Sequence, residues 1–306
     1  MHSLESAATP SPTPGGHALD IVLALVAALL FALGTVLQQK AGIDEPSEGS
    51  SASLLLRMVR RPVWLIGIAA DSLGFLAQAA ALGVGRLAVV QPLLVSSVVF
   101  ALPLGARLTG QRVRRLDVGA AFLVVAALVV FLTVANPSGG EADAPVRDWL
   151  IAGGICAAVC VPLVLLGQRG PAPRRAAMLG VATGVLFALS AALTKAVVDE
   201  LDNGVVAIVT GWHLYALAAV GYASMTLNQL ALNTGALAPA VATSMAFDPI
   251  TSVFLGVLLL HETLDASPPE VAATLLSLAA ALAGMAILAR SQSESPPVQR
   301  LASTVA

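Results

Sequence analysis

Two aspartates lie inside long apolar segments of the sequence, where a charged side chain is not expected. Asp71 is near the middle of the apolar run 63–82, and Asp248 is near the middle of the run 237–260. A charge at the centre of a bilayer costs about 2.5 to 3.5 kcal/mol, so such residues usually have a functional role. Both carboxylates are therefore candidate ligands for a proton, a cation substrate or a metal ion.

The alternative for each aspartate is structural: a protonated side chain that forms a hydrogen bond to a neighbouring helix. No arginine lies inside the membrane part of these segments to serve as a permanent partner, since Arg107 is at the end of its segment. This absence favours a titrating or cation-binding role.

Uncharged polar residues and prolines are concentrated in the same parts of the chain. Amides between membrane helices serve either as interhelical contacts or as ligand contacts, and both readings stay open. Paired prolines at corresponding places in two halves kink the helices and expose carbonyls to a binding site. The candidate substrate or ion ligands are Gln78, Gln91, Asn228, Gln229 and Asn233, and the candidate kinks are Pro92, Pro103, Pro239 and Pro249.

The composition requires a membrane around these residues. Hydrophobic residues make up 57% of the 306 residues and charged residues only 11%, a balance typical of proteins that are solvated mostly by lipid. Apolar windows of about 20 residues, enough to span a bilayer, recur about nine times. They are 18–39, 63–82, 87–108, 116–135, 148–167, 176–198, 205–230, 237–260 and 271–289.

The remaining segments fit this arrangement. Residues 1–17 contain no Lys or Arg, so we expect a disordered tail rather than a cleaved signal peptide. Residues 44–62 are expected to include a short helix on the membrane surface. The net charge of −2 makes nucleic acid an unexpected partner. Cys156 and Cys160, four residues apart in an apolar run, are expected to pack between helices.

The positive-inside rule gives the orientation, because basic residues stay with the cytoplasmic loops. Thirteen of the sixteen basic residues fall in alternate loops, which we place in the cytoplasm; Arg86 and Arg147 fall on the other side. The amino terminus is therefore expected outside and the carboxyl terminus inside. Lys40 and Lys195, near helix ends, are expected to act as interfacial anchors. The thirteen are Lys40, Arg57, Arg60, Arg61, Arg107, Arg112, Arg114, Arg115, Arg169, Arg174, Arg175, Arg290 and Arg300.

An internal repeat relates the two halves of the chain. Leu-Phe-Ala-Leu occurs at both 30–33 and 186–189, and Leu-x-Gln occurs at both 76–78 and 227–229. Each half then has four helices, and the extra helix between them inverts the second copy. Inverted repeats with a site near the midplane are the architecture of many secondary transporters.

The segment from Phe247 to Leu264 resembles the end of repeats in the drug/metabolite transporter (DMT) superfamily, of the EamA-like kind. In that superfamily an acidic residue and proline open the penultimate helix, as Asp248 and Pro249 do here. A Gly-Glu-Arg-Leu-like sequence closes it, and here His261 stands in place of the usual glycine before Glu262.

Within that superfamily the chain is most similar to the NIPA-type magnesium transporter branch. Gln38–Gly42 stands where that branch has a Lys-rich segment ending in Gly, and Asp71-x-x-x-Phe75 stands where it has Glu-x-x-Asn-Phe. Leu227–Asn233 is similar to its Leu-Asn-x-Ala-Leu-Asn stretch in spacing. The resemblance implies a carrier of two inverted repeats, with magnesium among the substrates to consider.

The sequence thus predicts an all-α polytopic protein of the cytoplasmic membrane. It consists of a four-helix repeat (18–135), a linker helix (148–167), an inverted second repeat (176–290) and a cytoplasmic tail (291–306). We expect a secondary transporter or facilitated carrier that moves a small solute or divalent cation by alternating access. The expected partners are the bilayer and that substrate, without a cofactor, and a homodimer stays open.

Two other functions stay open at this point. An intramembrane aspartyl protease also needs two aspartates in facing helices that share a proton. It fits less well, because neither Gly-x-Gly-Asp nor Tyr-Asp surrounds Asp71 or Asp248. A non-transporting partner in envelope assembly is the third reading, and it leaves both aspartates unexplained.

Overall fold

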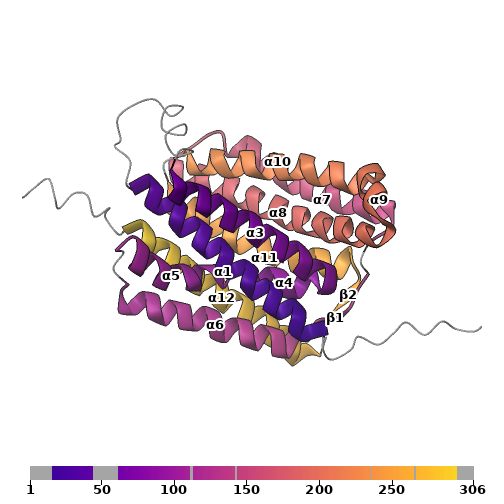
Figure 1. Ribbon diagram of the computed structural model, residues 1–306, viewed down its shortest axis with the longest axis horizontal. Coiled ribbons are helices and arrows are strands. Elements are labelled where there is room, and N and C mark those ends of the chain that lie inside the picture. Colours follow the sequence, from indigo (N-terminus) through magenta and orange to yellow (C-terminus); the bar gives the residue numbers. More distant parts are fainter. Residues whose placement is uncertain are drawn as a thin grey trace, which may run out of the picture.

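The long helices run back and forth along one axis as a bundle (Figure 1). This is a computed structural model, and it describes residues 16–43, 61–110, 113–141, 143–234, 236–264 and 267–294. The expected surface helix at 44–62 and most of both expected tails lie outside the described residues. The helices are α1 (Gly16–Ile43), α3 (Pro62–Val84), α4 (Leu87–Leu94), α5 (Ser97–Leu108), α6 (Arg115–Ala135), α7 (Val146–Leu166), α8 (Ala172–Asp199), α9 (Val205–Thr210), α10 (Trp212–Leu232), α11 (Leu237–Leu258) and α12 (Pro268–Glu294).

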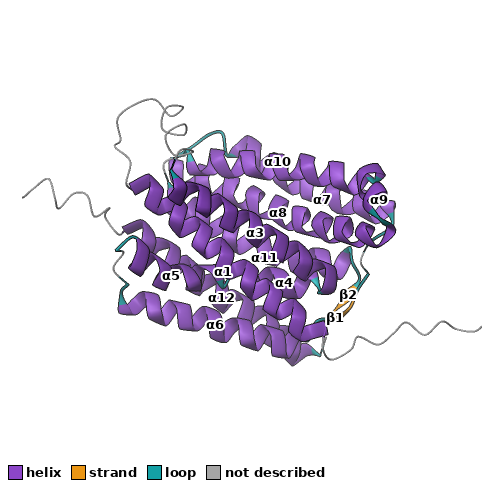
Figure 2. Ribbon diagram, in the orientation of Figure 1, coloured by secondary structure: helices purple, strands orange, loops and turns teal. Residues whose placement is uncertain are grey.

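Very little of the described chain is other than helical (Figure 2). A 3-10 turn, η1 (Glu200–Asn203), follows α8, and two short strands, β1 (Ser138–Gly139) and β2 (Glu262–Thr263), pair antiparallel. The strands and α9 lie at one end of the bundle (Figure 1). α1 begins at that end, and α12 finishes at the other.

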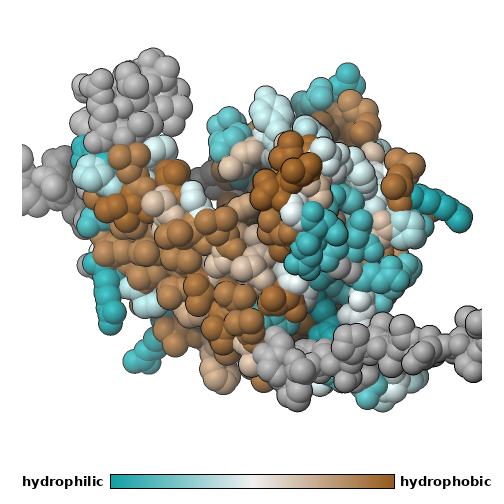
Figure 3. Space-filling model, turned by 45° about the vertical axis from the view of Figure 1, so that its right-hand side comes forward, coloured by the Kyte–Doolittle hydropathy of each residue, from teal (hydrophilic) through white to brown (hydrophobic). Residues whose placement is uncertain are grey.

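Eight helical segments of the described chain are long and apolar enough to cross a membrane. Their outward faces carry many large hydrophobic side chains, including Phe122, Leu150 and Leu276. Figure 3 shows a continuous hydrophobic area over the long helices, with hydrophilic residues gathered toward the end of the bundle that faces forward. The chain is therefore an all-α, multi-pass membrane protein.

The expected span at 205–230 needs correction. Gly211 adopts an extended conformation (φ −69°, ψ 144°) and divides the segment into α9 and α10. α10 has 21 residues but is not among the eight apolar spans. Its polar side chains, among them His213, Asn228 and Gln229, interrupt the apolar run that a span of this kind needs.

Helices that correspond in the expected repeat have corresponding neighbours. α1 packs against α3 and against α4 and α5, and α8 packs in the same way against α10 and α11. The last helices of the two halves, α6 and α12, pack against each other, and α7 packs mainly on α8. The repeat itself stays a prediction, although this pattern is the one it requires.

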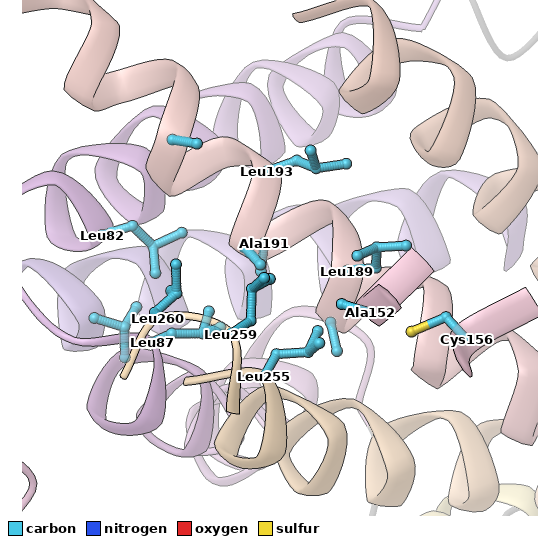
Figure 4. Packing of buried hydrophobic residues seen from close by; sticks show 14 of the residues in the cluster. Leu82, Leu87, Ala152, Cys156, Leu189, Ala191, Leu193, Leu255, Leu259 and Leu260 are labelled. Carbon is cyan, nitrogen blue, oxygen red and sulfur yellow. The ribbon is translucent and has the colours of Figure 1, made fainter. Parts of the chain in front are cut away.

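The largest buried apolar cluster lies where the two halves meet. Leu82 and Leu87, on either side of the α3–α4 turn, pack with Leu260 just after α11 (Figure 4). Leu193 of α8 and Cys156 of α7 belong to the same cluster. Both cysteines are buried and free, and Cys160 Sγ lies 3.6 Å from the Ala182 carbonyl oxygen of α8.

Glycine allows α8 and α11 to approach closely. A methyl group at Gly184 would lie 2.6 Å from the Ser244 carbonyl oxygen and 2.9 Å from the Asp248 nitrogen, both backbone atoms of α11. At Gly180, one turn earlier, it would lie 2.5 Å from the Ala240 carbonyl oxygen. Small residues four apart are a common basis for close helix packing in membranes.

We therefore expect Gly184→Ala to destabilise the protein by about 1–3 kcal/mol, because rigid backbone cannot move away from the added methyl group. Gly221→Ala is the matched control, since its added methyl group would meet no atom within 4 Å, and alanine favours helix by up to about 1 kcal/mol. Thermal unfolding of both purified variants in detergent is the measurement. Equal melting temperatures would contradict the close α8–α11 contact.

Candidate functional site

Asp71 lies on the face of α3 that packs against α1. The amide of Gln38 donates a hydrogen bond to Asp71 Oδ2. Gly34 and Gly67 allow the two helices to cross here, because a side chain at Gly34 would collide with the Asp71 carboxylate. Asp71 is half-buried. It therefore has one amide partner and partial access to its surroundings.

Gln78 lies on the same face of α3, two turns after Asp71. Helical spacing of three and four residues places Gly67, Asp71, Gly74 and Gln78 in one row. A methyl group at Gly74 would lie 3.0 Å from the ring of Phe31, so this row follows α1. Gln78 is half-buried.

Asp248 is half-buried in the middle of α11, beside the Gly184 crossing with α8. Ser252, which is fully buried, has its hydroxyl 3.4 Å from Asp248 Oδ1, at the outer limit of a hydrogen bond. Pro249 has no N–H and therefore leaves the Met245 carbonyl without its helical partner. The helix nevertheless continues through Pro249 without interruption.

The span formed by α4 and α5, in which α4 packs on α11, is interrupted. α4 ends at Leu94 and α5 begins at Ser97, with a turn at Val95 and Ser96 between them. The amides of Val95 and Ser96 donate to Pro92 and Leu93, three residues back, at 3.2 and 3.0 Å. Proline at 92 removes one helical hydrogen bond just before this tighter turn.

Gln91 is the most enclosed of the predicted ligands, with 3% of its surface exposed. Its Nε2 atom is buried and has no hydrogen-bond partner in the described part of the chain. An unpaired buried amide costs free energy, so such groups are uncommon in structural cores. Pro103 lies within α5 and Pro239 within the first turn of α11.

The predicted ligands of the seventh expected span lie apart from these. Asn228 is half-buried, and Gln229 and Asn233 are exposed. α10 packs mainly on α8, and it makes at most marginal contact with α3 in the described part of the chain. α3 and α11 likewise make at most marginal contact there. A single cavity shared by Asp71 and Asp248 thus stays a prediction.

Four buried charged residues gather where α3 turns into α4, and we call them the buried charge cluster: Asp20, Arg86, Lys195 and Glu262. Lys195 Nζ donates to the carbonyl oxygens of Leu82 (3.0 Å) and Gly85 (2.5 Å). It also interacts electrostatically with the other three members. Lys195 is 8% exposed, so the expectation that it anchors at the membrane surface is wrong.

Glu262 caps the first turn of α4. Its Oε1 accepts the Leu87 amide at 2.7 Å and its Oε2 accepts the Ala88 amide at 2.9 Å. Burial raises the pKa of the Glu262 carboxyl. The hydrogen bonds from the two backbone amides and the positive charges of Lys195 and Arg86 oppose this rise. His261 precedes it with a positive φ of 52°, a conformation in which glycine is least strained.

A second polar group joins three elements at the same end of the bundle. His213 Nδ1 lies 2.7 Å from Glu200 Oε1, and His213 Nε2 lies 3.2 Å from Asp143 Oδ1. Asp143 also accepts the indole N–H of Trp149 at 2.8 Å. The rings of Trp149 and Trp212 both pack on His213. Among the described residues, no three His, Cys, Asp or Glu side chains are placed to hold a metal ion.

One known protein is similar over most of the length. A protein of Corynebacterium glutamicum, described as uncharacterized, is 32% identical over 246 residues, which cover 80% of this chain and 85% of the relative. The chain belongs to the family of this corynebacterial protein. No family model and no solved structure matches the chain.

We expect Glu262→Gln to destabilise the folded protein by about 1–3 kcal/mol, because an amide can accept only one of the two α4 N–H groups and directs its NH2 at the other. Glu270→Gln is the matched control, since Glu270 also accepts a backbone amide, that of Ser267, but in an exposed place; its cost should stay below about 1 kcal/mol. The measurement is unfolding in detergent. An equal loss of unfolding free energy in both variants would show that the burial of Glu262 does not strengthen its hydrogen bonds.

Proposed function

We propose that this protein is a secondary carrier of the DMT superfamily, nearest to its NIPA-type branch, and that it moves a small solute or divalent cation across the cytoplasmic membrane. The observation that carries the proposal is the helix interruption at Val95–Ser96, at the same depth as Asp248. Discontinuous helices near the midplane form the substrate and ion sites of many secondary transporters.

The common depth follows from the packing of α4 on α11. A methyl group at Gly256 would lie 3.4 Å from the Ala88 nitrogen, and the two helices run in opposite directions from there. Eight residues forward from Ala88 is Ser96, and eight residues back from Gly256 is Asp248. Both steps cover about 12 Å in the same direction. Met245, one turn from Asp248, packs in the same apolar cluster as Val95.

The groups at this depth suit a cation. They include the Asp248 carboxylate and the Ser252 hydroxyl beside it. Pro249 adds the Met245 carbonyl oxygen, which has no helical N–H partner. Magnesium is bound through one or two carboxylates while it keeps several waters, so Asp248 could serve without a cage of acidic residues.

The proposal includes nine crossings, with α10 as the ninth, an extracytoplasmic amino terminus and two inverted repeats. The corresponding neighbours of α1 and α8 support the repeat. The opposite positions of the start of α1 and the end of α12 support an odd number of crossings. Exchange of conformation between such halves would expose the midplane to either side in turn.

The two alternatives receive less support. A protease would need Asp71 and Asp248 to share a proton across facing helices, and α3 and α11 make at most marginal contact in the described part of the chain. A non-transporting assembly partner would have no use for an interrupted helix and a carboxylate at one depth. We therefore propose a carrier rather than an enzyme.

Flux into liposomes tests the proposal. With purified protein and Mg²⁺ as the probe, read by an internal fluorescent indicator, Asp248→Asn should slow uptake roughly 10-fold or more, which corresponds to about 1.4 kcal/mol of lost binding. Asp71→Asn should also reduce flux, since its charge is removed while its bond to Gln38 can persist.

Asp202→Asn is the control for these variants, because Asp202 is exposed in η1. It should leave flux unchanged. The same liposomes are then tested with other divalent cations and small metabolites. Wild-type flux of every probe equal to that of empty liposomes, or full activity of Asp248→Asn, would contradict the proposal.

The proposed orientation makes a separate prediction for two exposed residues, Asp202 in η1 and Gln168 after α7. In intact cells an impermeant thiol reagent should label Asp202→Cys from outside and should label Gln168→Cys only after the membrane is opened. The native cysteines are buried and should contribute little background. The reverse pattern would place the amino terminus in the cytoplasm.

A further inference from the structure

A pocket of about 420 Å³ lies where α7 ends and the chain turns into α8. It is at the opposite end of these helices from η1 and the His213 group. Its lining combines apolar and basic side chains and contains no acidic residue. The lining residues are Leu165, Leu166, Gln168, Arg169, Gly170 and Arg174.

The turn that forms the pocket is held by its own contacts. The Gly167 amide donates to Leu163 at 2.8 Å, and Arg175 Nε donates to the Gly167 carbonyl at 3.2 Å. A side chain at Gly167 would press on Leu179 of α8, at 3.2 Å. Gly170 has a φ of 102°, which favours glycine. The pocket is therefore formed without a ligand.

Two arginines supply its charge. The side chains of Arg169 and Arg174 are exposed, and in the described part of the chain neither makes a hydrogen bond or an ion pair. Lys195, by contrast, is buried and fully engaged. The first turn of α8 adds the positive end of a 28-residue helix. Together these groups favour an anion.

The other wall of the pocket is apolar. Leu165 and Leu166 are 59% and 54% exposed, and they lie at the end of a membrane-spanning helix. Above them Ile155 and Val161 are also exposed, and α7 packs chiefly on α8 alone. A ligand that satisfies both walls has an anionic head and hydrocarbon chains.

We propose that this pocket binds the phosphate headgroup of an anionic phospholipid, whose acyl chains lie along the exposed face of α7. Basic pockets between membrane helices bind such headgroups. The site goes beyond the proposed transport and does not depend on it. A soluble phosphate would use the arginines but would leave Leu165 and Leu166 without a partner.

Lipid binding to purified, delipidated protein in mild detergent tests this, with phosphatidylglycerol compared against phosphatidylcholine by native mass spectrometry. Wild type should retain phosphatidylglycerol preferentially. The double variant Arg169→Gln/Arg174→Gln should bind it about 30-fold more weakly, since each basic group near a membrane surface contributes about five-fold. Arg174→Lys should retain most of the affinity, because its charge is kept.

Arg147→Gln is the matched control: it removes one exposed arginine from the opposite end of the same helix and should not change binding. Unchanged melting temperatures would show that all variants are folded. Three outcomes would overturn the proposal: no preference for phosphatidylglycerol, an equal effect of Arg147→Gln, or full displacement of the lipid by the same concentration of free glycerol phosphate.

Discussion

The carboxylate of Glu262 accepts hydrogen bonds from the first N–H groups of α4, a helix that begins inside the protein. The first N–H groups of any helix lack partners within it, and burial without a partner costs about 1–3 kcal/mol for each. Glu262 accepts two of them at the start of α4, from a position 175 residues further along the chain. Room for its side chain depends on Gly140 and Gly256, where a methyl group would meet the glutamate. The β1–β2 pair then holds the backbone around it.

On the α3 side of the same turn, the unpaired carbonyl groups are bonded by a positive charge, the ammonium of Lys195. The last carbonyl groups of a helix have no partner within it. At the end of α3, the Lys195 ammonium, which can only donate, forms hydrogen bonds to two such carbonyl groups. The α3–α4 connection therefore lies between an acid after α11 and a base on α8, both from the second half of the chain. Asp20 and Arg86 complete a set of two acids and two bases, in which each buried charge has compensation nearby. This end of the bundle is joined across the two halves by ionic contacts as well as by the apolar cluster around Leu82.

The features that depend on local composition could be predicted from the sequence. Long apolar windows identified the spans, and Pro92 marked the place after which α4 ends. The division at Gly211 was missed, because the segment 205–230 is apolar over most of its length and hydropathy alone does not register one extended glycine. The buried charge cluster was also missed. Its residues lie near segment ends, where basic and acidic side chains usually face water, and only tertiary contacts over 110 to 175 residues reveal their burial.

The closest helix contacts indicate which helices would move together and which could move relative to one another. α1 and α3 are in backbone contact at Gly34 and Gly67, and α8 and α11 are in backbone contact at Gly180 and Gly184. Close-packed pairs of this kind have little freedom to slide, because any shift brings backbone against backbone. The α3–α8 and α10–α11 contacts are slighter. A carrier built on this fold would therefore rock the α1–α3 pair against the α8–α11 pair. Such a motion would separate Glu262 and Lys195 from the α3–α4 turn that both now hold, so the buried charge cluster and the apolar cluster around Leu82 would together keep this end closed.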